Sequence, residues 1–255
     1  MKFKQLLCAS AVAVAATFSV PAFADEAKND QVFTTAEQTA IHEILVNYLY
    51  NNPQVLTMMQ QRLQQVNGGP TVSSDIDRDQ LESGPSDGAV DAPVTVVEFF
   101  DYNCGYCKKA GEFIKAIHVN YKPEDVRVVF REYPILSEGS RIAARYALAA
   151  HFGAPEMYMD VHNALMGTHT TLTAEADVQS VLASANIDVG KLQALMAKDD
   201  VRTSIENEIQ QNMDLGRQIG VTGTPSFVVG DAAVKGANIP ALKSLIDETL
   251  AALGS

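Results

Sequence analysis

The sequence VTVVEFFDYNCGYC, residues 94–107, decides the fold. Its first seven residues are mostly β-branched or aromatic, which is the composition of a buried strand. Cys104 and Cys107 follow directly, and a helical pattern continues from Cys107 to about Asn120. A second strand is expected at Val126–Tyr133, after a turn. A strand, a crossover helix and a strand form a βαβ unit, whose two strands should be parallel.

The rest of the chain extends this unit. Residues from about 137 to 218 have a helical pattern without strands, which predicts an all-helical subdomain inserted into the sheet domain. Pro225–Gly230 then predicts a strand, Asp231–Lys235 its hairpin partner, and Ile239–Leu250 a closing helix. This order predicts an α/β, thioredoxin-like fold over residues 89–255, interrupted by the helical insertion.

An N-terminal helical arm is expected over residues 25–66. Ile41, Leu45, Tyr48 and Leu49 recur at helical spacing behind a cap at Thr34 or Thr35, and Asn51-Asn52-Pro53 interrupts the pattern before a second helical stretch, Pro53–Val66. The polar residues 67–88 predict a linker with little of its own to bury. An apolar stripe on such an arm must be covered, either by the main domain or by self-association. We favour self-association into a homodimer or a larger homo-oligomer.

The first 24 residues have the order of a cleavable secretory signal peptide. Lys2 and Lys4 precede an apolar run over residues 6–20, and Pro21-Ala22-Phe23-Ala24 supplies small residues for cleavage after Ala24. The apolar run is short for a membrane span of about 20 residues, so an uncleaved anchor is the less favoured alternative. Cys8 would leave with the signal, and the mature chain would keep two of its three cysteines.

The net charge excludes some classes of partner. The chain has 19 basic and 31 acidic residues, a net charge of −12. Without Lys2 and Lys4, 17 basic residues face 31 acidic ones, which gives −14. Such a surface repels nucleic acid and anionic lipid, and we expect neither as a partner.

The spacing of Cys104 and Cys107 points to redox chemistry. Cys107 falls in the first turn of a helix, whose free N–H groups and dipole stabilise a thiolate at Cys104 below the free pKa of about 8.5. Cys104 is therefore the expected nucleophile and Cys107 the resolving thiol. A structural zinc site would need a second ligand pair, and a disulfide closing so short a ring would stabilise little. We expect no metal and no organic cofactor.

Two further positions belong to the predicted site. Glu98 is a charged residue inside an apolar strand, where it would relay protons to Cys107 or pair with Arg131 on the neighbouring strand. The two interpretations are compatible. Pro225 opens a strand without an N–H group, and a cis Thr224–Pro225 bond would expose the backbone of Thr224 to an extended substrate.

Residues 98–107, the helical insertion and the later Thr224-Pro225 resemble the DsbA-type bacterial periplasmic thiol-disulfide oxidoreductases over residues 89–255. The resemblance implies that Pro225 is a cis-proline facing the cysteines, that Glu98 is the family's buried acid, and that the protein is periplasmic. Oxidases of this family usually carry Pro-His between the cysteines. Gly105-Tyr106, with Thr224 before the proline, is instead similar to the dimeric DsbC-type isomerases. The arm is similar to the oligomerising arms of ScsC-like proteins.

The sequence thus predicts a periplasmic enzyme that forms, and also isomerises, disulfides in unfolded or misoxidised exported proteins. Its redox group would be the Cys104–Cys107 disulfide, with substrate contacts at Thr224, Gly105 and Tyr106 and a membrane partner that resets the site. An oxidase without isomerase activity is the first alternative. A chaperone, or a copper(I) carrier that uses the two thiolates, are alternatives from other classes.

Overall fold

The computed structural model describes residues 34–56, 72 and 75–254. The chain divides between Met58 and Met59 into two compact units. The signal peptide expected at residues 1–24, the beginning of the arm and residues 57–66 of the helical stretch expected at Pro53–Val66 lie outside the described residues. None of the helices in the described ranges combines the length and the apolar character that crossing a membrane requires.

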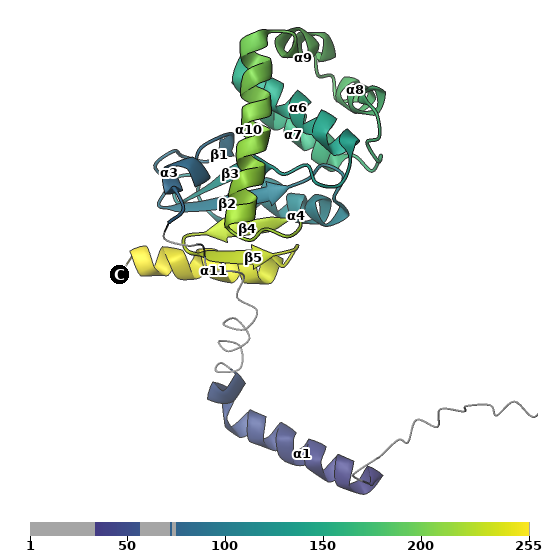
Figure 1. The fold of residues 1–255 in the computed structure, drawn as a ribbon. Coiled ribbons are helices and arrows are strands. Elements are labelled where there is room, and N and C mark those ends of the chain that lie inside the picture. The colour runs from purple at the N-terminus through teal and green to yellow at the C-terminus, as the bar shows by residue number, and fades with distance from the viewer. Residues whose placement is uncertain (1–33, 57–71, 73–74, 255) are drawn as a thin grey trace, which may run out of the picture. The chain divides into compact units, whose positions relative to one another are not determined.

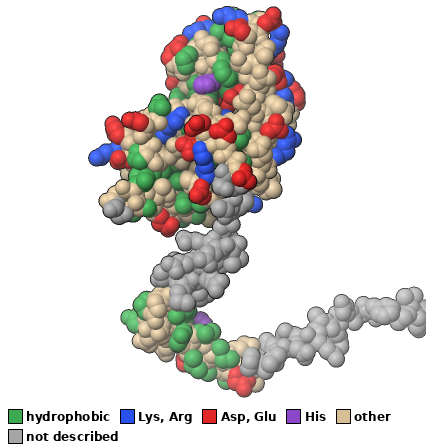
Figure 2. Space-filling view, turned by 60° about the vertical axis from the view of Figure 1, so that its left-hand side comes forward, with side chains coloured by type: hydrophobic (Ala, Val, Ile, Leu, Met, Phe, Trp, Pro, Cys, Tyr) green, Lys and Arg blue, Asp and Glu red, His purple; other side chains and the backbone are tan. Residues whose placement is uncertain are grey.

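In the first unit, α1 (Thr35–Asn51) confirms the helix expected at the start of the arm. Its N-terminus is a capping box, in which the Thr34 N–H donates to the Glu37 carboxylate (2.7 Å) and the Glu37 N–H donates to the Thr34 hydroxyl (3.4 Å). The helix ends before Pro53, as predicted. Most of its large apolar side chains are exposed, including Ile44 (67%) and Tyr50 (86%), and Figure 2 shows hydrophobic side chains along this helix.

The second unit is built on a five-stranded sheet in the order β1-β3-β2-β4-β5. The strands β2 and β3 are parallel, which confirms the βαβ unit, and β4 and β5 form the expected hairpin antiparallel to β2. The strands are β1 (Ser86–Asp87), β2 (Val94–Phe100), β3 (Val126–Glu132), β4 (Ser226–Val229) and β5 (Ala232–Lys235).

The helical insertion lies between β3 and β4 in the chain, as the pattern predicts. In Figure 1, α6 to α9 gather beyond one side of the sheet, and α10 runs from them back toward β4. The crossover helices are α4 (Gly105–Lys115) and α5 (Ile117–Asn120), and the insertion contains α6 (Glu138–Gly153), η1 (Pro155–Met157), α7 (Tyr158–Gly167), α8 (Glu175–Ser184), α9 (Val189–Met196) and α10 (Asp199–Gln218). Closing the chain, α11 (Ile239–Leu253) contacts β2, β4 and β5.

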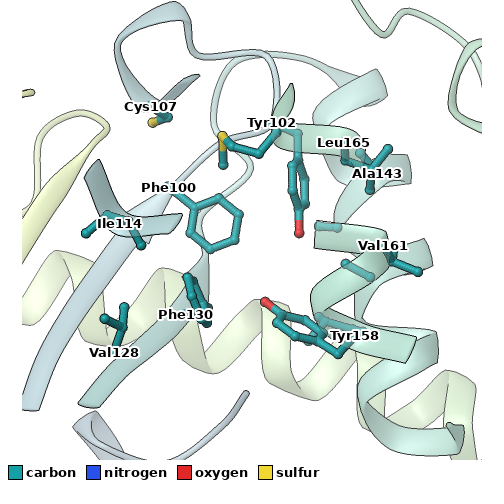
Figure 3. Packing of buried hydrophobic residues seen from close by; sticks show 14 of the residues in the cluster. Phe100, Tyr102, Cys107, Ile114, Val128, Phe130, Ala143, Tyr158, Val161 and Leu165 are labelled. Atoms are coloured by element: carbon teal, nitrogen blue, oxygen red, sulfur yellow. The ribbon is translucent and has the colours of Figure 1, made fainter. Parts of the chain in front are cut away.

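Aromatic side chains join the sheet to the insertion and fix the end of β2. Phe100 packs edge-on against Tyr102, with ring centroids 5.1 Å apart, and Phe130 packs against Tyr158 of α7 at 6.1 Å (Figure 3). All four rings are buried. Such aromatic pairs stabilise beyond the area that they bury, so the segment leading to the cysteines is held firmly on the core.

The prediction that residues 67–88 have little to bury is wrong for the described part of that segment. Val72, Ile76 and Leu81 are buried, with exposed fractions of 2%, 8% and 0%. The segment forms the short helix α3 (Arg78–Leu81) and β1, which pairs with β3. We therefore place residues 75–88 in the sheet domain.

A buried arginine is the physical reason for this correction. The guanidinium of Arg131 is fully buried and donates to the backbone oxygens of Gln80 and Leu81 and to the Ser83 hydroxyl. Polar groups of this segment are thus paired with a buried cation rather than with water. The polar composition of this segment therefore led to the wrong prediction that it is a linker.

Replacing Leu81 by alanine should lower the free energy of unfolding by about 2–4 kcal/mol, because the side chain is wholly buried and its loss leaves a cavity. Denaturant unfolding of the Leu81→Ala variant measures the loss. Val90→Ala is the matched control, since Val90 is 82% exposed and should change stability by less than about 0.5 kcal/mol. Equal stabilities of the two variants would return this segment to the role of a linker.

Candidate functional site

The two cysteines lie where β2 gives way to α4. Cys104 is the N-cap residue of α4, and its sulfur accepts a hydrogen bond from the Cys107 N–H at 3.3 Å. Both cysteines are free thiols. Cys107 is fully buried and Cys104 retains an exposed fraction of 6%. The first sulfur is thus the one that an incoming thiol or disulfide reaches.

The surroundings give the two thiols opposite acidities. Hydrogen bonds lower the pKa of Cys104 to about 5, with the Cys107 side chain as the largest cause and the Thr224 side chain and the N–H groups of Cys107 and Tyr106 adding to it. Burial raises the pKa of Cys107 far above its ordinary value. At neutral pH, Cys104 is therefore a thiolate and Cys107 a protonated thiol.

The segment before β4 contacts Cys104, although the two are 120 positions apart in the sequence. The Thr224–Pro225 peptide bond is cis. Sγ of Cys104 lies 3.1 Å from the carbonyl oxygen of Thr224, to which it donates a hydrogen bond when the thiol is protonated. The structure therefore brings Thr224 and Pro225, expected from the sequence, beside Cys104.

The residues between the cysteines face outward. Gly105 is exposed, and apart from its chain neighbours and the backbone of its own helix no atom of the described residues lies within 4 Å of the position that a Cβ would occupy there. Tyr106 has an exposed fraction of 65%, and the Lys109 ammonium lies 5.3 Å from the centroid of its ring. An extended chain can therefore approach Cys104 over Gly105 without a clash with side chains.

Glu98 lies within β2, opposite Phe130 of β3, and is 1% exposed. Burial and, second, the charge of Cys104 raise its pKa to about 8, and Oε1 has no hydrogen-bond partner among the described residues. The charge of Glu98 in turn raises the pKa of Cys107. Glu98 is thus a buried acid that is electrostatically coupled to both thiols.

The alternative that Glu98 pairs with Arg131 is wrong. Arg131 donates instead to the Glu208 carboxylate and to the Asn212 side-chain oxygen, both at 2.8 Å. It lies opposite Phe99 on β2, whereas Glu98 lies opposite Phe130. Because alternate residues of a strand point to opposite faces, the two side chains lie on opposite sides of the sheet.

Two residues of the cysteine loop were missed from the sequence. The buried Asp101 carboxylate accepts from the Asn103 N–H (2.8 Å) and from the N–H groups of Ile135 (2.9 Å) and Leu136 (3.0 Å). The Asn103 side chain bonds to the helical insertion. Asp and Asn next to a helix start are a known capping signal, but the partners lie 34 or more positions away.

Apart from Glu98, a cluster of four buried polar side chains lies between the sheet and the insertion. The Tyr158 hydroxyl donates to the Glu132 carboxylate at 2.7 Å, and the Tyr102 hydroxyl lies 3.2 Å from His162 Nδ1. Burial raises the pKa of Glu132 to about 8 and lowers that of His162 to about 3. Both groups are therefore mainly neutral at pH 7. No local pattern in the sequence distinguishes Glu132 or His162 from other polar residues.

Within the described ranges, no three or more His, Cys, Asp or Glu side chains are grouped so as to hold a metal ion. The two thiols, Cys104 and Cys107, give the site a pair of groups that can exchange disulfides. An acidic, accessible thiol beside a buried second thiol is suited to exchange of disulfides with another molecule.

The comparisons with known proteins agree with this chemistry. Residues 95–247 match the family model described as DSBA-like thioredoxin domain. Disulfide bond formation protein D of Bacillus subtilis is 26% identical over 174 residues, covering 67% of this chain and 78% of that protein. Two Na(+)/H(+) antiporters of Salinispora species are also similar, but the chain spans only 25% and 26% of their length.

Solved structures place the chain in the same group. A thioredoxin-like oxidoreductase from Silicibacter pomeroyi has 40% identity and a TM-score of 0.59, over 68% of this chain and 97% of that chain. A linker-deletion mutant of Proteus mirabilis ScsC has 27% identity and a TM-score of 0.60, over 87% of this chain and 99% of that chain. A third structure, from Wolbachia pipientis, is described as a thiol-disulfide exchange protein and has 30% identity and a TM-score of 0.60, over 67% of this chain and 90% of that chain. With more than half of its length matched by the family model, this chain belongs to the DSBA-like thioredoxin domain family.

Proposed function

We propose that this chain is an exported oxidoreductase that forms and isomerises protein disulfides through Cys104 and Cys107. The observation that carries the proposal is the contrast between the acidic, accessible Cys104 and the buried, protonated Cys107. A low pKa makes Cys104 both a thiolate at neutral pH and a good leaving group.

In oxidation, a substrate thiolate attacks Sγ of Cys104 in the Cys104–Cys107 disulfide. The S–S bond of the site breaks, and Cys107 leaves and takes up a proton. A second substrate thiolate then attacks the mixed disulfide and expels Cys104 as a thiolate. The substrate gains one disulfide and loses two electrons, which the two cysteines of the site accept.

Isomerisation starts from the reduced site and has no net redox change. The Cys104 thiolate attacks a wrong substrate disulfide, which forms a mixed disulfide and releases one substrate thiolate. That thiolate attacks a second disulfide of the substrate and displaces a different substrate thiolate, which then attacks the mixed disulfide and expels Cys104 as a thiolate. Cys107 rescues complexes that fail to rearrange by closing the disulfide of the site. The Gly105-Tyr106 pair and Thr224 support this activity through their similarity to the DsbC-type isomerases.

Thr224 is the proposed docking point for an extended substrate segment, because its backbone lies against the sulfur that the substrate must reach. Gly105 leaves the approach open, and the exposed Tyr106 ring supplies an apolar contact. The substrates are unfolded or misoxidised proteins of the periplasm, and a membrane redox partner resets the site. The reaction uses the disulfide of the site itself, without a metal or an organic cofactor.

The N-terminal arm is proposed to join copies of this chain. The exposed apolar side chains of α1 support this role, as does the ScsC match, which covers 87% of this chain. Deletion of residues 25–66 should give a monomer that still oxidises dithiols but no longer isomerises disulfides. Sedimentation measures the first effect and substrate refolding the second. A truncated protein that still sediments as a dimer would contradict the proposal.

The test of isomerisation is the recovery of activity from a disulfide-scrambled substrate protein by the reduced mature enzyme. Strong recovery that disappears in the Cys104→Ser variant is the expected result. Rapid oxidation of a reduced substrate without such recovery would leave an oxidase. Recovery that survives Cys104→Ser would instead indicate a chaperone.

A further inference from the structure

The loop between α7 and α8, residues 168–174, forms hydrogen bonds with the residues on both sides of the Cys104–Cys107 motif. The Lys108 ammonium, directly after Cys107, donates to the backbone oxygen of Thr168 at 2.5 Å. Asn103, directly before Cys104, donates from Nδ2 to the backbone oxygen of Leu172 and accepts from the Leu172 N–H at Oδ1, both at 2.8 Å. The motif is therefore attached to the insertion from both flanks.

Asn103 makes a second connection, to the first turn of α6. Its Nδ2 lies 2.9 Å from the Ser137 hydroxyl and 3.2 Å from the Ser140 hydroxyl, so the two amide protons serve three acceptors. The Ser137 hydroxyl also caps α6 by accepting the Ser140 N–H at 3.1 Å. A single side chain thus joins the cysteine loop to two separate parts of the insertion.

The surrounding structure leaves little room for this junction to shift. A Cβ at Gly139 would lie 1.9 Å from the Leu172 backbone oxygen, so α6 and the loop are in close contact. Ser140 has no exposed surface and Asp101 has 1%. Asp101 accepts from the Asn103 N–H as well, which also restrains the backbone of Asn103. Buried networks with all members paired are rigid.

The geometry points to Asn103 as a positioning residue that sets the reactivity of Cys104 by fixing the cysteine loop to the helical insertion. The sulfur has two close contacts from different elements, the Cys107 N–H at 3.3 Å and the Thr224 carbonyl oxygen at 3.1 Å. A shift of the Asn103 backbone moves Cys104 relative to both. This inference rests on the proposed role of Cys104 as the reactive thiolate.

The test is titration of the Cys104 thiolate by its absorbance at 240 nm in the reduced mature protein, residues 25–255, which lacks Cys8. Asn103→Ala should raise the midpoint by about one pH unit, which lowers the thiolate fraction about tenfold at pH 4. Ser140→Ala, which removes one partner of Asn103 at a distance from the sulfur, should give a smaller shift in the same direction. Its effect should vanish in the Asn103→Ala background, because the two residues act through one bond.

Ser184→Ala is the matched control, because its hydroxyl bonds only to the backbone oxygen of Ser180 within α8 and should leave the midpoint unchanged. If the variants melt at lower temperature but their Cys104 midpoints match that of the wild type, this inference is wrong and the proposed function is unaffected. If Asn103→Ala does not fold, the shift in Ser140→Ala decides. A wild-type protein without an acidic thiolate would overturn the proposed function itself, and this inference with it.

Discussion

Cys107→Ala is expected to accumulate covalent complexes in which Cys104 is joined to substrate proteins. In the wild type the buried Cys107 thiol lies against Cys104 and can attack the mixed disulfide from within the site. Without it, release depends on an external thiol, and the lifetime of the complex should lengthen from the order of seconds to the order of hours. Non-reducing electrophoresis followed by peptide mapping measures both the amount and the position of the linkage.

The double variant Cys104→Ser/Cys107→Ala is the control for this prediction, because it keeps the fold of the site and lacks the attacking sulfur. It should trap no substrate. Complexes that form in the double variant, or a Cys107→Ala protein that traps nothing, would mean that the roles of the two cysteines are assigned wrongly.

Glu98→Gln should slow the release of mixed disulfides by about a hundredfold at pH 8. Cys107 must lose its proton to attack, and burial keeps its pKa high. Glu98 carries an unpaired oxygen and a pKa raised by burial to about 8, so its carboxylate can accept this proton. In the wild type the release rate should rise with pH up to about 8. The variant should lack this rise in single-turnover measurements.

The same variant should be more stable than the wild type at pH 8, by on the order of 4 kcal/mol. Burial raises the folded-state pKa of Glu98 from 4.5 to about 8, so the neutral form is favoured in the folded state. The resulting stability is fully present below pH 4.5 and is lost as the pH rises through about 8. Denaturant unfolding at several pH values should therefore give a flatter profile for Glu98→Gln.

Glu132→Gln is the matched control for both effects. The pKa of Glu132 is also raised to about 8 by burial, but its carboxylate bonds to Tyr158 in the cluster of four buried polar side chains. This variant should share the flatter stability profile and leave the release rate unchanged. Equal slowing in the two variants would show that loss of any buried carboxylate disturbs the site, and would remove Glu98 from the proton path.

Local patterns predicted most of the fold. The strands β2, β3 and β4 fall close to their expected bounds, since nearly all of their residues are buried and each strand is therefore an apolar run in the sequence. The segment between β3 and β4 contains helices and no strand, as its pattern predicts. Residues 75–88 were not recognised, because their burial depends on Arg131, which lies about 50 positions away. Single-sequence patterns carry no information on such a partner.

The site divides in the same way. Cys104 and Cys107 could be predicted as site residues from their spacing, and Glu98 because it is a charged residue inside an apolar strand. The roles of Asp101 and Asn103 depend on Leu136, Ser140 and Leu172, which only the folded insertion brings to them. The strand register, which the sequence left open, decides that Arg131 lies on the face opposite Glu98.

The most direct test of the account is site-mapped alkylation of the fully reduced protein across the pH range 3 to 9. Iodoacetamide should modify Cys104 alone, with a rate that rises through a midpoint near pH 5, because the hydrogen bonds at the N-terminus of α4 hold the pKa of this thiol at about 5. Cys107 should remain unmodified, since it is buried and protonated throughout this range. Modification of Cys107, or of neither cysteine below pH 8, would contradict the assignment of Cys104 as a preformed nucleophile.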